Sequence, residues 1–136
     1  MKAELDAVLR SLQPRLMEGS YAFSRLDGGV VPSSAIGWFR EVEGITVILP
    51  LADAPAHQLE VVFEAAWIAL GVESPLSSVG LTAAIATVLA EAGIACNVVA
   101  ACHHDHLFVP IDRADEAIDI LSQFRVQSTK FMPPRY

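Results

Sequence analysis

The stretch SPLSSVGLTAAIATVLAEAGIACNVVAACHHDHLFVPI, residues 74–111, holds the clearest helix and hairpin patterns in this chain of 136 residues. Ser77 or Ser78 is expected to cap the start of an amphipathic helix in its first half. Gly93 is placed to end this helix, with Ile94 folded back towards Leu89. The apolar side chains that recur at helical spacing are Leu81, Ile85, Val88, Leu89 and Ala92.

The second half of the stretch predicts a β-hairpin. Residues 94–102 and 107–111 are expected to be its strands, with residues 103–106 (HHDH) as the turn between them. Cys96 and Cys102 fall on one face of the first strand, roughly 20 Å apart at the rise of an extended chain. That separation excludes a disulfide between them and predicts two buried free thiols.

The rest of the chain predicts further elements around this stretch. A helix is expected over 113–124 with Asp112 as its N-cap, and 125–131 fits either a last strand or a loose terminus. Residues 59–70 satisfy both the helical and the alternating strand pattern, so periodicity alone does not decide their structure. The upstream elements are expected to be a helix over 3–13 that packs as a lid, a strand over 21–26, a short helix over 33–42 and a strand over 45–51.

Composition and charge limit the class of protein. Hydrophobic residues make up 53% of the chain and charged residues 18%, which predicts a compact globular fold. The net charge of −7 disfavours nucleic acid and anionic membranes as partners, because both require clustered Lys and Arg. No apolar run approaches the roughly 20 residues that span a bilayer, and the polar opening MKAELD does not match a signal peptide. A cytoplasmic protein is therefore expected.

Three runs carry a resemblance to a known family: EGITVILP (43–50), the part of the opening stretch that covers 74–100, and HDHLFVP (104–110). Together they resemble the small bacterial tandem ACT-domain proteins of unknown function. The resemblance extends over about residues 5–121. It agrees with the order helix, strand, strand, helix, which matches the later part of a βαββαβ unit.

The resemblance has implications for fold and function. The fold would be α+β, with ferredoxin-like (ACT) βαββαβ units in tandem, each an antiparallel sheet with helices on one face. Residues 1–58 would form an N-terminal helix and an abbreviated first unit, residues 59–136 a more complete second unit, and 59–70 a strand. Related ACT pairs sense amino acids, so the resemblance implies a non-catalytic regulatory or sensor protein that needs no cofactor. Its partners would be an amino acid or related metabolite and a second copy or another protein.

The candidate ligand site lies at the start of the helix expected in the opening stretch. In related ACT pairs the ligand binds where the loop and helix N-terminus after a first strand meet a neighbouring unit, a place that here corresponds to Ser77, Ser78, Val79, Gly80 and Leu81. Unpaired backbone N–H groups and the helix dipole favour a carboxylate there. Gly80 has no side chain to block a ligand, and the two serines add hydroxyl donors. The alternative is that a serine only caps the helix.

Four other polar residues complete the candidate ligand set. Asn97 falls in an apolar strand, where leaving a buried amide unpaired costs roughly 1–3 kcal/mol, so it needs the loop backbone or a ligand as a partner. His104, Asp105 and His106 either stabilise the hairpin turn or contact a small molecule. The alternative function is a metal-binding protein or small metal-dependent enzyme that uses His103 to His106. Consecutive residues of an extended chain point to opposite sides, so no metal ligand is assigned. No catalytic residue is assigned either, because no partner base, nucleophile or metal motif defines a reaction class.

Overall fold

The computed structural model describes residues 2–127, which form two compact units. The insert unit comprises residues 18–66. The main unit comprises the described residues on either side of it, 2–17 and 67–127. The division between residues 58 and 59 stays a prediction, because it concerns consecutive segments, whereas these two units are defined by packing.

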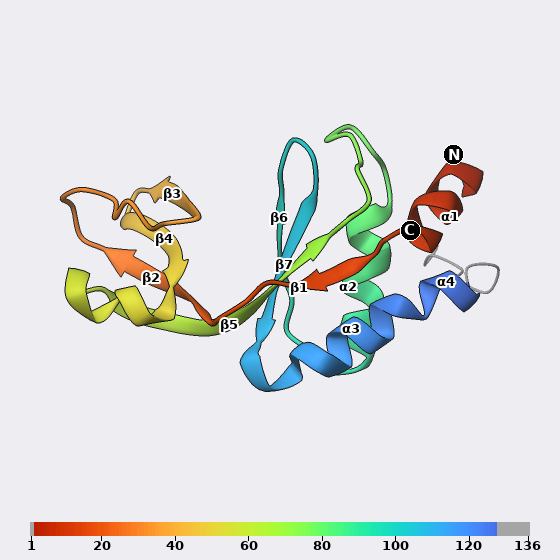
Figure 1. Ribbon diagram of the computed structural model, residues 1–136. Coiled ribbons are helices and arrows are strands. Elements are labelled where there is room, and N and C mark those ends of the chain that lie inside the picture. The colour runs from red at the N-terminus through yellow and green to blue at the C-terminus, as the bar shows by residue number, and fades with distance from the viewer. Residues whose placement is uncertain (1, 128–136) are drawn as a thin grey trace. The chain divides into compact units, whose positions relative to one another are not determined.

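The sheet of the main unit has the strand order β1-β5-β7-β6 (Figure 1). Its strands are β1 (Pro14–Leu16), the last residues of β5 (Glu60–Leu70), β6 (Asn97–Ala100) and β7 (Asp105–Pro110). β1 runs antiparallel to β5, and β6 runs antiparallel to β7. If β5, β6 and β7 are counted as strands one to three, β1 occupies the place of the fourth strand in the ferredoxin order 4-1-3-2. The N-terminal segment therefore completes the sheet of the main unit.

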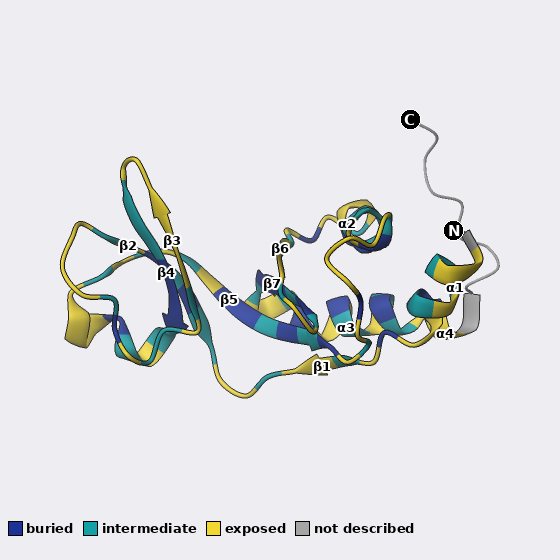
Figure 2. Cartoon of the chain, turned by 90° about the horizontal axis from the view of Figure 1, so that it is seen from above, coloured by how far each residue is buried: buried dark blue, intermediate teal, exposed yellow. Residues whose placement is uncertain are grey.

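The main unit also contains the helices α1 (Lys2–Arg10), α2 (Leu81–Glu91), α3 (Ala114–Ser122) and α4 (Phe124–Gln127), with a 3₁₀ turn, η3 (Ile111–Arg113), before α3. Helix α3 packs on β1 and β7, while α1 packs on α2 and α4. Along β5 the fully buried Ile68 and Leu70 alternate with the half-buried Trp67 and Ala69 (Figure 2). This alternation is typical of a strand that helices cover on one face. Within residues 2–127 no helix has the length and apolarity needed to cross a bilayer.

The end of α2 follows the prediction. Gly93 has a φ of 71°, a backbone conformation that glycine adopts without a steric penalty. The Ile94 N–H donates to the Leu89 carbonyl at 2.9 Å, and the Gly93 N–H donates to the Ala90 carbonyl at 2.9 Å. These two bonds are the pair that defines a Schellman motif, so the predicted return of Ile94 towards Leu89 is confirmed.

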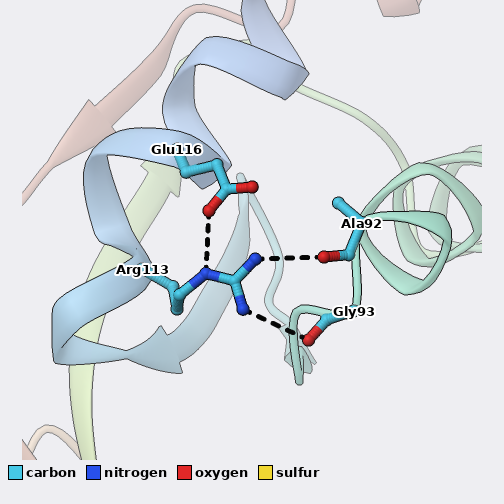
Figure 3. Close-up of polar contacts among 4 residues, drawn as sticks. All are labelled: Ala92, Gly93, Arg113 and Glu116. Carbon is cyan, nitrogen blue, oxygen red and sulfur yellow. Dashed lines mark hydrogen bonds and ion pairs between the residues drawn. The ribbon is translucent and has the colours of Figure 1, made fainter.

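Arg113 ties this end of α2 to the start of α3 (Figure 3). Its guanidinium donates through Nη2 to the Ala92 carbonyl at 3.0 Å and through Nη1 to the Gly93 carbonyl at 3.4 Å. Arg113 Nε also donates to Glu116 Oε2 at 2.8 Å, and this hydrogen bond lowers the pKa of Glu116. Arg113 is also the N-cap residue of α3, so the prediction of Asp112 as N-cap is wrong. The carbonyls left free at the end of α2 thus find a cationic donor.

The insert unit has the strand order β3-β4-β2-β5. Its strands are β2 (Tyr21–Leu26), β3 (Gly37–Glu41), β4 (Gly44–Pro50) and the first residues of β5, and all pairings between neighbours are antiparallel. Two 3₁₀ turns, η1 (Leu51–Asp53) and η2 (Pro55–His57), join β4 to β5. Ala22, Val47 and Leu49 form its buried core. Counting β2 as the first strand again gives the order 4-1-3-2.

The short helix predicted over 33–42 is wrong, because residues 37–41 form strand β3. Glu41 pairs with Gly44 across a two-residue hairpin loop, and Gly37 pairs with Ile48 at the other end. The helical spacing of a few apolar residues was coincidental. Pairing with the buried strand β4, together with the strand preference of adjacent Trp and Phe, decides the structure of this segment.

The predicted α+β class with tandem ferredoxin-like units is confirmed by the two sheets. The strand at 59–70 is also confirmed as β5, and the strands at 21–26 and 45–51 as β2 and β4. The strand considered over 125–131 is wrong for residues 125–127, which lie in helix α4. Residues 128–131 lie outside the described part of the chain.

Candidate functional site

The candidate site begins at the loop that joins β5 to α2, residues 71–80. The helix starts later than predicted, because its N-cap is Gly80, with φ of 100° and ψ of −17°. No side chain caps it, so the predicted capping by Ser77 or Ser78 is wrong. The first helical hydrogen bond runs from the Ala84 N–H to the Gly80 carbonyl at 2.9 Å, and the N–H groups of residues 81–83 have no helical acceptor. Together with the helix dipole, these donors favour an anionic group.

A cavity of about 330 Å³ lies beside this helix start. Its wall is formed by α1, the β5–α2 loop and the first residue of α2: Glu4, Leu5, Val8, Ser74, Pro75, Ser77, Ser78, Val79 and Leu81. Four of the five residues predicted at the helix start thus line one cavity. The fifth, Gly80, packs against α1, since a Cβ placed on it would lie 3.1 Å from Leu5 Cδ2. Helix α1 therefore covers the start of α2, as the lid prediction for 3–13 requires.

Sequence reasoning missed the part of the wall that α1 and Ser74 supply. Leu5 and Val8 belong to the apolar stripe of α1, but the most buried residues of this segment, Leu9 in α1 and Leu12 just after it, are at most 1% exposed. The apolar stripe predicted that one face of this helix is buried, but it did not show which residues of the chain lie opposite that face. Ser74 carried no sequence signal of its own, because a serine before a proline is typical of any loop.

Ser74 is the most unusual residue of the cavity wall. It is only 6% exposed, and its hydroxyl forms no hydrogen bond with any residue between 2 and 127. Among the described residues, the fully buried side-chain oxygens without a partner are those of Ser24 and Ser34, so the Ser74 oxygen keeps some access to solvent. Because Ser74 borders the cavity, its hydroxyl is available to a molecule bound there.

The tip of the β6–β7 hairpin contacts the beginning of the same loop. His104 Nδ1 lies 3.2 Å from the Val72 carbonyl oxygen, to which it donates, and His103 Nδ1 lies 3.3 Å from Glu73 Oε1. These contacts hold the two residues that precede Ser74. His104 therefore supports the loop and is not among the residues that line the cavity.

Asp105 and His106 lie in strand β7 and not in the turn, so their predicted position is wrong. Ala100 pairs with Asp105, which confines the connection to residues 101–104. Trp67 Nε1 donates to His106 Nδ1 at 3.0 Å, and the indole ring also stacks near Phe108. Since Nδ1 accepts this bond, the imidazole is neutral.

Burial governs the titration of this pair. Burial, together with the nearby His104, lowers the pKa of His106, and the Asp105 carboxylate opposes this shift. Burial also raises the pKa of Asp105, against the opposite effect of His106. Neither residue lines the cavity, so the pair forms a separate polar cluster in the sheet.

Asn97 and the cysteines differ from their predictions. Asn97 is exposed on β6, so the argument that a buried amide needs a ligand does not apply to it. Both thiols are free. Cys96 is half-buried, and burial raises its pKa to about 11, whereas Cys102 is exposed, so the prediction of two buried thiols is wrong for Cys102.

The described residues offer two further observations on possible sites. Between residues 2 and 127, no group of three or more His, Cys, Asp or Glu side chains is placed to hold a metal ion. A hollow of about 80 Å³ in the insert unit is bordered by Arg25, Glu41 and Glu43. There Glu41 accepts a hydrogen bond from Thr46, and Arg25 pairs with Glu60 at 3.2 Å. Arg25 and Glu41 of this small hollow are thus already partnered within the chain.

Comparisons with known proteins agree with the fold. Family models described as ACT domain match residues 2–66 and residues 62–123. The chain is similar to a Vibrio cholerae protein of unknown function, described as a possible transport protein. The two are 40% identical with a TM-score of 0.81, over 90% of this chain and 97% of that one. No curated protein matches the sequence significantly.

Two more distant structures share the fold alone. An Agobacterium tumefaciens protein is 20% identical with a TM-score of 0.65, over 84% of this chain and 89% of that chain. A structure of aspartokinase alpha and beta subunits gives 10% identity and a TM-score of 0.61, over 82% of this chain and 96% of that chain.

Proposed function

Because the chain belongs to the ACT domain family, we propose that it is a non-catalytic regulatory protein that binds an amino acid in the cavity beside the start of α2. The observation that carries the proposal is the cavity itself, where uncapped N–H groups of α2 adjoin an apolar wall. The donors suit a carboxylate, and the apolar wall suits the remainder of a small molecule.

The candidate ligand residues take different parts in this proposal. Ser77, Ser78, Val79 and Leu81 contact the ligand, and Gly80 lets Leu5 of α1 pack against the helix start beside it. His104 acts indirectly, because it holds the loop through the Val72 carbonyl. Asn97, Asp105 and His106 are left without a direct contact, since they are not part of the cavity wall.

The proposal includes transmission of the bound state to a second copy or another protein. Strand β3 is the outer strand of the insert sheet, and its Trp38 and Phe39 are 52% and 72% exposed. Outer strands with exposed aromatic side chains favour association with a further chain. A cytoplasmic location suits this function and is part of the same proposal.

A thermal-shift screen of the full chain with the twenty amino acids, followed by calorimetry of the hits, tests the proposal. At a ligand concentration about 100 times the Kd, binding to the folded state stabilises it by about 2.7 kcal/mol. Val79→Asp places a negative charge on the cavity wall and should reduce the affinity at least about tenfold, because it repels the ligand carboxylate. Val42→Asp, on a hairpin loop of the insert unit, is the matched control.

Both substitutions replace an exposed valine, so neither should unfold the protein. The proposal expects Val42→Asp to bind like the wild type and Val79→Asp to lose binding. Equal loss in both variants would place the site elsewhere, and no stabilisation of the wild type by any amino acid would contradict the function itself.

A further inference from the structure

The cavity wall carries a negative group as well as donors. Glu4 is an exposed residue in the first turn of α1 that borders the cavity, and it forms no hydrogen bond or ion pair with any side chain described between residues 3 and 125. It precedes Leu5, whose side chain packs against Gly80. A carboxylate without a partner among the described side chains therefore lies on the α1 side of the cavity.

The donors on the other side are of two kinds. The first are the N–H groups at the start of α2, which no side chain caps. The second is the hydroxyl of Ser74, a residue that is 6% exposed, borders the cavity and has no hydrogen-bond partner among the described residues. This unpartnered hydroxyl is an observation independent of the helix terminus, and it is available to a ligand atom.

The remaining wall selects for an apolar group. Leu5, Val8, Pro75, Val79 and Leu81 offer hydrocarbon surface, and the described residues of the cavity wall include no Lys, Arg or His. A positively charged ligand side chain would compete for Glu4, and a negatively charged one would meet no counter-charge among these residues. The wall therefore matches a molecule with one carboxylate, one ammonium group and an uncharged apolar side chain.

We propose that this cavity is specific for α-amino acids with an aliphatic side chain, and that Glu4 binds their ammonium group while Ser74 and the start of α2 bind their carboxylate. The inference rests on the proposed function and adds its ligand class and the role of α1. Glu4 makes the site dependent on a helix that lies far from α2 in the sequence. Removal of the ammonium group from the ligand should then have the same effect as removal of the Glu4 charge.

Calorimetry with matched ligands and variants of the full chain tests this assignment. The probes are leucine and 4-methyl-2-oxopentanoate, which share the carboxylate and the side chain but differ at the ammonium group. Glu4→Gln should weaken leucine binding about tenfold or more, since a hydrogen-bonded charge pair is lost, and should leave the affinity for the oxo acid unchanged. Glu91→Gln, exposed at the far end of α2, is the control and should change neither affinity.

Ser74→Ala should weaken binding of both probes about fivefold, because both present the carboxylate. It should leave the Tm of the free protein unlowered, because the hydroxyl has no partner to lose. If Glu4→Gln lowers both affinities equally, or no more than Glu91→Gln, the ammonium assignment is wrong while amino-acid binding stands. If the wild type binds neither leucine nor valine nor alanine, the assignment of an aliphatic amino acid is overturned. If it also binds no other amino acid, the proposed function is overturned as well.

Discussion

The two units share one strand order and differ in what joins the strands. In the main unit the first and second strands, β5 and β6, are joined by a loop and the 11-residue helix α2. In the insert unit the equivalent strands, β2 and β3, are joined by residues 27–36, and residues 18–66, all of them described, contain no α-helix. Of these two connections, only the one between β5 and β6 therefore provides a helix start with free N–H groups. The same strand order therefore occurs with a helical crossover in one unit and without one in the other.

Two buried serines show the same difference. Ser24 of β2 is 1% exposed, has no hydrogen-bond partner and pairs across the sheet with the buried Val47. Ser74 is also a buried residue without a partner among the described residues, but its oxygen keeps some access to solvent and the residue borders a cavity of about 330 Å³. In the first case the unsatisfied hydroxyl is only a cost to stability. In the second a ligand can satisfy it, which is why only Ser74 enters the functional argument.

The largest expected effects come from core truncation in each unit. Ile85→Ala in α2 and Leu49→Ala in β4 remove fully buried side chains, and each should lower the free energy of unfolding by about 2–5 kcal/mol. The two variants should differ in ligand response. Ile85→Ala loosens the helix whose start forms the site, so the rise in Tm on adding ligand should shrink, whereas Leu49→Ala should retain it.

Thermal unfolding with and without the ligand identified by screening measures both quantities. Should Leu49→Ala lose the ligand response as fully as Ile85→Ala, the division of labour between the two units would be refuted.

A smaller effect is expected at the ends of α2. Gly80→Ala and Gly93→Ala both force an alanine into a positive φ, 100° and 71°, and each should cost about 1–2 kcal/mol. Only Gly80→Ala brings a Cβ within 3.1 Å of Leu5, whereas a Cβ at Gly93 meets nothing within 4 Å. Gly80→Ala should therefore also displace α1 and weaken ligand binding.

Hydrogen exchange of α1 and calorimetry separate strain from displacement. In Gly93→Ala, exchange in residues 2–10 should match the wild type and binding should persist. Faster exchange of α1 in both variants would mean that the contact between Leu5 and Gly80 has no special role.

The structural features that depend only on residues close together in the sequence were predictable from it. Gly93 and Ile94 form a local motif, and the β-branched run in β4 has few alternatives, so both were predictable. Residues 59–70 fitted two periods, and only the family resemblance assigned them to a strand. The helix predicted over 33–42 was wrong because the structure of β3 depends on its pairing with β4, and the helical spacing of residues within 33–42 carries no information on that pairing.

The candidate site was predictable on the α2 side only. Ser77, Ser78, Val79 and Leu81 form one short segment, and the family resemblance located it at the start of a helix. Glu4 and Ser74 are far apart in the sequence, and they share a cavity only because β1 joins the edge of β5 and brings α1 to the same unit. The predicted hairpin turn, residues 103–106, lies two residues later than the observed connection, residues 101–104. The register of a hairpin cannot be predicted from a run of four polar residues alone.

The smallest expected effect concerns the polar cluster of the main unit, which lies apart from the cavity. His106 accepts a hydrogen bond from Trp67 at Nδ1, and burial and His104 lower its pKa from the ordinary 6.5. Because the folded state prefers the neutral ring, its contribution to stability is complete above about pH 6.5 and is lost as the pH falls through the lowered pKa. Protonation at Nδ1 also removes the acceptor of Trp67.

Trp67 fluorescence in a Trp38→Phe background should therefore change as the pH falls below about 6.5, while its Tm declines over the same range. His106→Gln, which keeps an acceptor but does not titrate, should abolish both changes. Asp105→Asn should move the midpoint to still lower pH, because the Asp105 carboxylate favours the protonated ring. Ligand affinity should stay constant throughout, since neither His106 nor Trp67 borders the cavity. An affinity that followed the fluorescence change would instead couple this cluster to the site, and the separation between the two regions of the main unit would have to be abandoned.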